Sequence, residues 1–512
     1  MSEAYTVPGV YVTENNGASL SIQHGETAVP VFVGFFNAKK RPEKSAPLAC
    51  VRIESWLDFT QQFGPSDRIK FELKNLTLSS GLAKDNVISQ GHATSYAGSH
   101  CIRLYFENGG GPCYILNLER EAVDPQTRQI APAIELCPDI TLLCWCEFVD
   151  QAMDQSIYTA LGTLLAATPT SGGNPGRFML TDAWPTGASD SPSQWEFKAP
   201  TVAEKTQVAS YFPALLTAHT RDYSEYLNEK HRHWISCNLS EAQLKLLKEL
   251  GVKPEHGQTT VTLSQLIEHK GKISTVASGG AELASIIDAV NTHLPATIAA
   301  LQEKADPVLL RASVAMAGIY ARVDRERGVW KAPANVGIAG VTALLAEGFS
   351  AAGQKWDPPV PVRIDDALNA KLIETDINAI RAFRGQGIVV WGARTMTPSG
   401  QTDWRYVSVR RLFNTLERDA RATLRTVVFE PNSPVIWEQV RGALDNYLNA
   451  LWRQGALQGD TAAQAYYVQI GLGTTMSKED IDSGRMIVKI GVAAVRPAEF
   501  IVLQLTQDVS AG

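Results

Sequence analysis

The sequence predicts a mixed α+β protein of several domains, with an extended β-rich segment at each end. Three observations lead to this prediction. The chain has 512 residues, which is too many for a single hydrophobic core. Short apolar runs typical of strands alternate with amphipathic helical patterns along most of its length. Both ends are rich in aromatic and β-branched residues that have no local segment to pack against.

The composition excludes several classes of protein. Charged residues make up 20% of the chain and hydrophobic residues 45%, as expected for a globular protein rather than a disordered one. A net charge of -6 argues against a nucleic-acid partner, because phosphate backbones are bound by clustered Lys and Arg. Residues 1–20 lack the parts of a secretory leader, and no apolar run approaches the ~18 residues that span a bilayer. We therefore expect a soluble chain made in the cytoplasm, without direct membrane insertion.

The seven cysteines predict reduced and mostly buried thiols. Cys144 and Cys146 would point to opposite faces of a strand, and the other spacings follow no disulfide framework. His231, His233 and Cys237 form an H-x-H-x3-C pattern, but a metal site needs three or four converging ligands and no fourth is near. We predict no metal and no other cofactor. The cysteines are Cys50, Cys101, Cys113, Cys137, Cys144, Cys146 and Cys237.

The N-terminal part begins with a segment that has two interpretations. Residues 1–20 are either a frayed terminus or an extended arm whose strand pairs with another sheet. Further on, residues 29–38 predict a buried strand, and Ser55 is placed as the N-cap of a helix that Gly64 ends. The β-forming residues that favour the arm are Tyr5, Val7, Val10, Tyr11 and Val12.

The middle of the chain predicts an α/β region at residues 135–310. Within it, residues 228–306 have the character of an inserted helical module of about 75 residues, since amphipathic helical patterns dominate there. The remaining elements expected are strands at 140–146 and 177–184, a helix at 154–167 and a largely helical segment at 200–219.

Two long helices and the start of a third are predicted between residues 309 and 424. The first is rich in small residues, so it should pack closely, and Gly328 ends it. The charge run at its end, residues 324–327, is either a solvated helix end or an inter-subunit ion-pair patch. The second helix, at 407–424, has one apolar face; its other face has Arg410, Arg411, Arg418 and Arg421. Between them, Asp365 and Asp366 mark a helix start, where acids suit the helix dipole.

The C-terminal stretch at 426–506 predicts a strand, a capped helix, a polar loop and two more strands. Ser433 and Pro434 begin the helix, with proline at its first position. Its apolar stripe is Ile436, Val440, Leu444, Leu448 and Leu451. The whole chain has no Ser–His–Asp pattern, no G-x-S-x-G, no H-E-x-x-H and no phosphate-binding glycine motif that opens a helix, so we expect no enzyme.

Ordered blocks of the sequence resemble the tail sheath proteins of contractile phage tails and of phage-tail-like contractile injection particles. The resemblance covers all of the chain except roughly residues 225–305, and it is most specific from Gly318 to Leu505. The blocks are PGVYV, FENGGGPCYIL, ITLLCWC, RFMLTD, YFPALL, AGIYARVDRERGVWKAPAN, LIETDINAIRAFRGQGIVVWGARTM, and the stretch from WRYVSVRRLFNTLERD to RPAEFIVLQL.

The resemblance implies a sheath subunit with a core built from N- and C-terminal parts. It implies hexameric rings of this chain, stacked helically on an inner tube protein, with baseplate and terminal cap proteins and paralogous sheath subunits as further partners. Such a particle is assembled in the bacterial cytoplasm and is part of a phage tail or a released extracellular injection particle. The expected parts are an N-terminal arm (1–20), two core parts (21–134 and 311–495), an inserted outer region (135–310) with the helical decoration (228–306), and a donated C-terminal strand (496–512).

The resemblance also implies that terminal strands are exchanged between subunits. The N-terminal arm and a strand from Glu499 to Thr506 would be donors, and a hairpin around residues 486–495 an acceptor. Gly491, Arg496 and Pro497 would form the hinge before the donated strand. Besides the arm residues named above, the exchange residues are Met486, Val488, Ile490, Val492, Phe500, Val502, Leu503 and Leu505.

We further hypothesise that the helix after Ser433 faces the inner tube through Arg441, Trp452 and Arg453; the alternative is a solvated face. The competing hypothesis for the whole protein is a soluble α/β enzyme or binding protein with its site in residues 135–305.

Overall fold

The chain forms two compact units in the computed structural model. The main unit contains the described residues of 26–414 and 497–499, and the C-terminal unit contains 415–496 with the described residues before Glu26. The chain therefore enters the C-terminal unit after Asn414 and leaves it after Arg496. The structure describes residues 21–22, 24–39, 47–64, 71–73, 87–89, 97–119, 123–166, 176–220, 235–252, 260–277, 279–303, 307–398 and 402–499.

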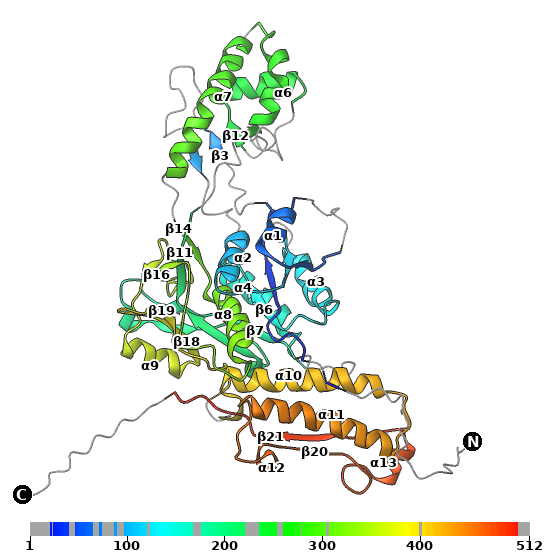
Figure 1. The fold of residues 1–512 in the computed structure, drawn as a ribbon. Helices are drawn as coiled ribbons and strands as arrows, with labels where there is room; N and C mark the ends of the chain where they lie inside the picture. Colours follow the sequence, from blue (N-terminus) through cyan, green and yellow to red (C-terminus); the bar gives the residue numbers. More distant parts are fainter. Residues whose placement is uncertain are drawn as a thin grey trace, which may run out of the picture. The chain divides into compact units, whose positions relative to one another are not determined.

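A nine-stranded sheet forms the centre of the main unit (Figure 1). The strands from β18 to β5 run parallel, and the strands at both edges pair antiparallel. The central strands are buried along their length, as expected for parallel strands covered on both faces. The strand order is β15 (Val336–Gly337), β19 (Gly387–Val390), β18 (Ile377–Phe383), β10 (Val208–Phe212), β7 (Phe178–Asp182), β6 (Leu142–Trp145), β1 (Pro30–Gly34), β5 (Cys113–Asn117) and β2 (Val51–Ile53).

Helices cover both faces of this sheet. The alternation along β1 places Phe32 in one apolar core and Val31 and Val33 in the other. Helices α2 (Gly98–Glu107) and α8 (Ala312–Arg327) pack on the first face. Helices α3 (Val123–Glu135) and α4 (Gln151–Gly162) pack on the second.

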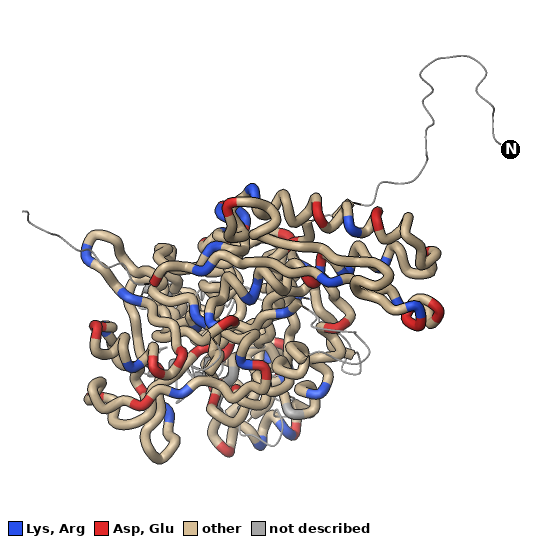
Figure 2. The backbone as a smooth tube through the Cα atoms, turned by 90° about the horizontal axis from the view of Figure 1, so that it is seen from below, with Lys and Arg blue, Asp and Glu red and all other residues tan. Residues whose placement is uncertain are grey.

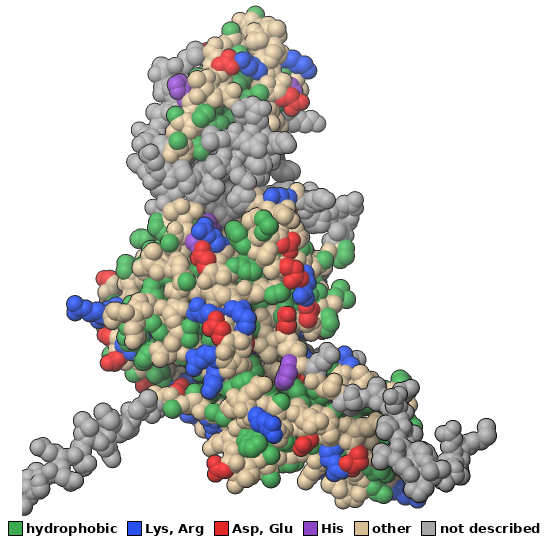
Figure 3. Space-filling model, viewed as in Figure 1, with side chains coloured by type: hydrophobic (Ala, Val, Ile, Leu, Met, Phe, Trp, Pro, Cys, Tyr) green, Lys and Arg blue, Asp and Glu red, His purple; other side chains and the backbone are tan. Residues whose placement is uncertain are grey.

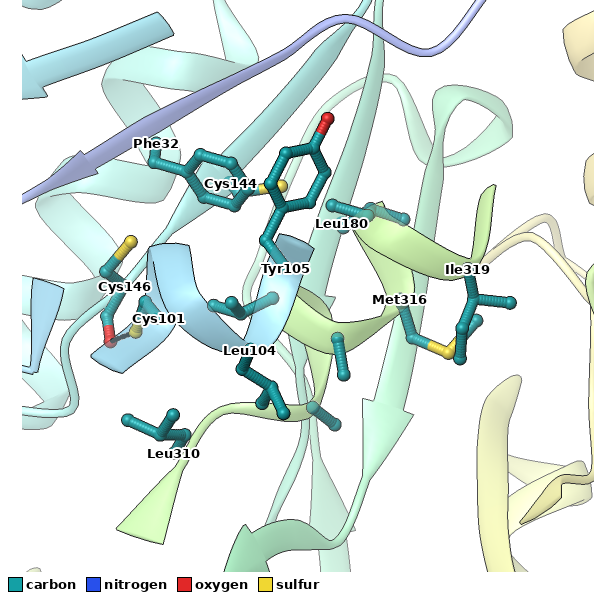
Figure 4. Close-up of a cluster of buried hydrophobic side chains, with 14 of the residues drawn as sticks. Phe32, Cys101, Leu104, Tyr105, Cys144, Cys146, Leu180, Leu310, Met316 and Ile319 are labelled. Atoms are coloured by element: carbon teal, nitrogen blue, oxygen red, sulfur yellow. Dashed lines mark hydrogen bonds between the residues drawn. The ribbon is translucent and has the colours of Figure 1, made fainter. Parts of the chain in front are cut away.

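The small-residue helix α8 packs closely against α2, as predicted. A Cβ atom added to Gly318 would lie 2.5 Å from the carbonyl oxygen of Tyr105, so only glycine permits this approach. Figure 4 shows the resulting core, with Tyr105 from α2 and Met316 from α8 among its members. Gly328 ends α8 with a φ of 93°, which confirms the predicted stop.

Two expectations about the middle of the chain are wrong. The segment 200–219 is mostly strand rather than helix: after a 3-10 turn at Lys205–Gln207 it forms β10 and β11 (Ala214–Thr220), because a short buried apolar run suits a strand as well as a helix. The proposed boundaries near residues 134 and 310 are also not separations between domains. Strands from all three predicted ranges lie in the same nine-stranded sheet.

A second sheet of the main unit flanks an inserted module. Its strand β11 ends at Thr220, and its strand β14 (Pro307–Leu310) pairs antiparallel with β11. The chain between these two strands contains the predicted helical module, so the module is inserted between paired strands. The order of this sheet is β14, β11, β16 (Val341–Ala346) and β17 (Val360–Pro361).

The module is not purely helical, because it has its own sheet and its own apolar core. Two of its four strands come from a distant part of the chain: β3 (Phe71–Leu73) pairs with β12 (Ile235–Asn238). Of the three residues in the H-x-H-x3-C pattern, Cys237 is fully buried, and His231 and His233 lie outside the described residues. The other elements are β4 (Val87–Ser89), β13 (Thr260–Thr262), α5 (Glu241–Glu249), α6 (Leu263–Ile273) and α7 (Gly280–Glu303).

The C-terminal unit is built from the end of α10 (Val407–Leu424), the long helix α11 (Pro434–Arg453) and a two-stranded sheet. The bounds of α10 agree with the prediction, and Ser433 and Pro434 begin α11 as predicted. The strand expected at the start of this stretch is absent: residues there form a 3-10 turn, and Phe429 is fully exposed with a φ of 75°. The remaining elements are α12 (Ala462–Ala465), β20 (Tyr466–Gln469), α13 (Lys478–Asp482) and β21 (Lys489–Val492).

The arginine face of α10 is not exposed along its whole length, since Arg410 and Arg411 are both buried in the main unit. Arg411 donates to the two carboxylate oxygens of Asp324 at 2.9 and 2.5 Å. Asp324 belongs to the charge run at the end of α8, and it is paired within the chain rather than solvated or left for another subunit.

The remaining short elements include two predicted helix starts that are confirmed. Ser55 accepts a hydrogen bond from the Asp58 amide at the start of α1 (Trp56–Gln62). Asp365 accepts one from the Leu368 amide at the start of α9 (Asp366–Glu374). The other strands are β8 (Trp184–Thr186) and β9 (Glu196–Lys198).

Candidate assembly interface

The two-stranded sheet of the C-terminal unit has the geometry of an unfinished sheet. Strand β21 pairs antiparallel with β20, in the register Tyr467 with Gly491 and Val468 with Ile490. Among the described residues no third strand joins them. A two-stranded ribbon is marginally stable in water, and an open strand edge pairs readily with another chain.

The hydrogen-bond pattern tells which backbone groups of β21 face outward. The amide of Ala493 donates to the Ala465 carbonyl at 2.8 Å, so Ala493 faces the β20 side. In an antiparallel pair, alternate residues face the partner strand and the open edge. The amide and carbonyl groups of Ile490 and Val492 therefore point to the open edge, where another strand can reach them.

The two faces of this small sheet differ. Val468 packs against the apolar cluster of the unit, which includes Val440 and Leu444 of α11. On the opposite face Tyr467 is half exposed, and its ring lies over Gly491. The visible face of the unit has apolar side chains among charged ones (Figure 3). One side of the sheet is thus supported by α11, while the other remains accessible.

The structure places some of the predicted exchange residues in this sheet and others beside it. Ile490 and Val492 lie in β21, whereas Met486 and Val488 precede it and pack against the apolar cluster. The remaining predicted exchange residues lie outside the described residues; they are Tyr5, Val7, Val10, Tyr11, Val12, Phe500, Val502, Leu503 and Leu505.

The predicted hinge residues have different surroundings. Gly491 lies inside the β20–β21 ladder rather than in a loop, so its assignment to a flexible joint is wrong. A Cβ atom there would lie 2.2 Å from the Tyr467 ring, which is a half-exposed side chain. Arg496 and Pro497 lie in irregular chain where the C-terminal unit ends and the main unit resumes, and their role as a hinge stays a prediction.

The surface of α11 carries the three residues predicted to face a tube. Arg441 is 42% exposed and forms an ion pair with Glu438 one turn earlier. Arg453 is exposed, whereas the Trp452 indole donates to the Gly459 carbonyl at 2.9 Å and is partly buried. The two arginines are thus accessible to a partner, and Trp452 is occupied in holding the following loop.

The main unit contains a cluster of buried ion pairs around Arg311. Arg311, 3% exposed, lies 2.5 Å from Asp154 and 3.8 Å from Asp182. Burial raises the pKa of Asp182 and of Glu347, and Lys355 lies 3.3 Å from the Glu347 carboxylate. A small cavity lies beside this cluster, and its acids are matched to cations, so it has the character of a structural network.

The described residues contain no group of three or more His, Cys, Asp or Glu side chains placed to hold a metal ion. None of the described helices combines the length and apolarity needed to cross a membrane. Figure 2 shows acidic and basic residues interspersed along the backbone of the described chain.

Comparisons with known proteins give a consistent result. The family model of the phage tail sheath C-terminal domain matches residues 399–508. The tail sheath protein of Vibrio phage KVP40 is 27% identical over 142 residues, which is 28% of this chain and only 19% of that protein.

Solved structures match over nearly the full length. The helical sheath of the anti-feeding prophage in its contracted state is 31% identical, with a TM-score of 0.61 and coverage of 99% of this chain and 100% of that one. A chain of the anti-feeding prophage baseplate, six-fold symmetrised, has the same identity and coverage and a TM-score of 0.60. The contracted PVC sheath complex of an extracellular contractile injection system is 28% identical, with a TM-score of 0.58 and 99% coverage of both chains.

Proposed function

The chain belongs to the contractile tail sheath protein family, and we propose that it polymerises around an inner tube and contracts to drive that tube through a target envelope. It is a structural subunit of a contractile sheath. The observation that supports this most strongly is the match of nearly the whole chain to a helical sheath in the contracted state. A soluble enzyme with its site in residues 135–305 is not supported, and we infer a mechanical rather than catalytic role.

The open edge of β21 supports strand exchange as the means of linking subunits. A donated strand beside β21 would pair with the outward groups of Ile490 and Val492. Each added backbone hydrogen bond contributes roughly 0.5–1.5 kcal/mol net, so a few of them give a link that a rigid-body rotation need not break. The donors are the segments predicted from the sequence, residues 1–20 and the strand from Glu499 to Thr506.

The further partners follow from the same proposal. Subunits form hexameric rings stacked helically, the tube is contacted through Arg441 and Arg453 of α11, and baseplate and terminal cap proteins close the ends of the polymer. Paralogous sheath subunits join the same lattice. The particle is assembled in the bacterial cytoplasm and serves as a phage tail or a released injection particle.

The test of polymerisation uses the edge of β21. Ile490→Pro removes an outward amide without removing a bond of the β20–β21 ladder, so the free chain should keep its thermal unfolding midpoint while tube formation in negative-stain microscopy is lost. Ile490→Thr keeps the amide and should still form tubes. Removal of residues 1–14 or 498–512 should also leave soluble, unassembled chain. Normal tube yield from Ile490→Pro would exclude this edge as the acceptor.

The tube contact is tested separately. Arg441→Glu and Arg453→Glu together should reduce co-assembly with a candidate tube protein, because both arginines are accessible on α11. Arg485→Glu, at another exposed arginine of the same unit, is the matched control. Equal co-assembly by the wild-type protein, the Arg441/Arg453 double variant and the Arg485→Glu control would show that this face of α11 is solvated.

A further inference from the structure

Glu499, the last described residue of the chain, is bound by Arg394 of the main unit. The Glu499 carboxylate accepts hydrogen bonds from Arg394, with Nε at 2.9 and 3.2 Å from its two oxygens and Nη2 at 2.5 Å. The two side chains are 16% and 23% exposed, so the pair is largely withdrawn from water. A guanidinium that grips a carboxylate through two nitrogens fixes its direction as well as its position.

Arg394 is itself fixed by groups that belong to the main unit. The buried Asn378 side chain of β18 donates to the Arg394 carbonyl at 2.8 Å and accepts from the Arg394 amide at 2.7 Å. Arg394 also forms a β-bridge with Tyr406, whose hydroxyl lies 3.4 Å from the Glu499 carboxylate. An ordinary surface ion pair contributes little to stability, because the free energy gained is offset by the entropy lost when two long side chains are ordered. In this pair the backbone of Arg394 is already held by Asn378, so less entropy is lost when Glu499 binds.

The opposite end of the chain has a comparable anchor in the C-terminal unit. Ile22 packs against the apolar cluster of that unit, and the His24 ring lies 4.9 Å from the Tyr447 ring. The Gly25 amide donates to Asp419 at 3.4 Å. Each terminal segment is therefore held at its root. The residues proposed to pair with other subunits precede the anchor at the N-terminus and follow it at the C-terminus.

The connection between the two units is correspondingly short near the C-terminus. The Val495 amide donates to the Ala456 carbonyl at 3.3 Å within the C-terminal unit. Glu499 is bound by Arg394 within the main unit. Residues 496–498 alone connect these two anchored positions, and they include the predicted hinge residues Arg496 and Pro497.

We propose that Arg394 is a positioning residue for subunit linkage, which grips Glu499 and sets where and in which direction the C-terminal segment leaves the subunit. This inference rests on the proposed function, because the segment matters for assembly only if it is donated to another subunit. It moves the start of the donated strand, predicted at Glu499 from the sequence, to the residues after Glu499. Glu499 itself is an anchor and not part of an exchanged strand.

Charge reversal tests the proposal. Arg394→Glu and Glu499→Arg, each alone, should lower the yield of sedimentable tubes by about tenfold, because like charges then face each other. The double reversal should recover more than half of the wild-type yield. In the unassembled chain, hydrogen exchange of the amides near residues 498 and 499 should accelerate in each single variant and slow again in the double variant. Glu499→Gln should fall between wild type and the reversals in both measurements.

The control is Asp366→Asn, which removes another ion pair of the main unit, with Arg381 at 2.8 Å. It should change neither tube yield nor exchange near residue 499. Wild-type yield from both single reversals, or a double variant that is folded but does not recover, would overturn the proposal. So would a fall in the thermal unfolding midpoint large enough to account for the lost tubes. If the wild-type chain forms no tubes, the proposed function fails, and unchanged exchange in the single variants would then refute the anchor as well.

Discussion

The nine-stranded sheet of the main unit and the two-stranded sheet of the C-terminal unit differ in how many of their strands are paired on both sides. In the nine-stranded sheet every central strand has a neighbour on each side, and the edge strands β15 and β2 have only two and three residues. In the C-terminal unit the described sheet has two strands of four residues each. Edge strands of two or three residues offer few backbone groups to another strand. The edge of β21 leaves the groups of Ile490 and Val492 facing outward, and under our proposal these groups pair with a strand of another subunit.

The units also differ in how they use charge. The main unit buries Arg311 with Asp154 and Asp182, and Arg411 with Asp324. The ion pair of α11 between Arg441 and Glu438 is exposed. Burying a charge is tolerated only where its partners are fixed, and the C-terminal unit likewise buries the Asp419 carboxylate, 3.4 Å from Arg418. The contrast is therefore between the fully buried clusters of the main unit and the exposed pair on the surface of α11.

The largest effect is expected from breaking the buried cluster. Arg311→Met leaves Asp154 and Asp182 without their cation and should lower the free energy of unfolding by about 3–5 kcal/mol. Urea unfolding of the unassembled chain measures this. Glu438→Gln, which breaks the exposed pair of α11, should cost less than about 1 kcal/mol. Similar losses in the two variants would contradict the contrast between the units.

A second comparison uses two glycines in helices. Gly318→Ala places a Cβ atom 2.5 Å from the Tyr105 carbonyl oxygen, and backbone cannot move away cheaply, so a loss of about 1–3 kcal/mol is expected. Gly442 lies in α11 with open space where its Cβ would be. Gly442→Ala should therefore stabilise the chain by about 0.5–1 kcal/mol, since alanine favours a helix more than glycine does. Thermal unfolding measures both, and a change of the same sign would refute the comparison.

Much of the fold was predictable where local pattern decides it. Helix α10 agrees with its predicted bounds because its apolar period is strong, and α11 begins at its cap. The segment that forms β10 and β11 was mistaken for a helix because a short buried run has no diagnostic period. The burial of Arg411 could not be read from α10, since its partner Asp324 is 87 residues away.

The candidate interface was predictable only in part, because its geometry depends on residues that lie far apart in the sequence. The β-rich character of residues 486–492 indicated a strand, but which groups face the open edge depends on the register with β20. Glu499 resembled the first residue of a donated strand. Its role as an anchor depends on Arg394, which lies 105 residues away and is held in place by Asn378.

Acid should weaken the main unit through His219. Burial lowers the pKa of His219 despite the hydrogen bond with Glu107 at 2.9 Å, and Arg103 and His100 act in the same direction as burial. As pH falls through about 6.5 the unfolded chain takes up a proton that folded His219 resists, so stability falls by up to about 1 kcal/mol per pH unit. Urea unfolding at pH 7.5, 6.5 and 5.5 should show this slope. His219→Gln should reduce it, and an unchanged slope would assign the effect to other groups.

The smallest effect is expected at the glycine of the incomplete sheet. A Cβ atom on Gly491 would lie 2.2 Å from the Tyr467 ring, whereas one on Gly318 would lie 2.5 Å from the Tyr105 carbonyl oxygen. Distance alone therefore predicts a larger loss of stability at Gly491. The neighbour here, however, is a half-exposed side chain that can rotate into water, whereas the neighbour of Gly318 is buried backbone. Gly491→Ala should therefore change the free energy of unfolding by less than about 0.5 kcal/mol. In a Tyr467→Ser background even that change should disappear, because the obstructing ring is gone. A loss as large as that of Gly318→Ala would mean that the β20–β21 sheet is as tightly enclosed as the core of the main unit, and the contrast between a complete unit and an open one would fail.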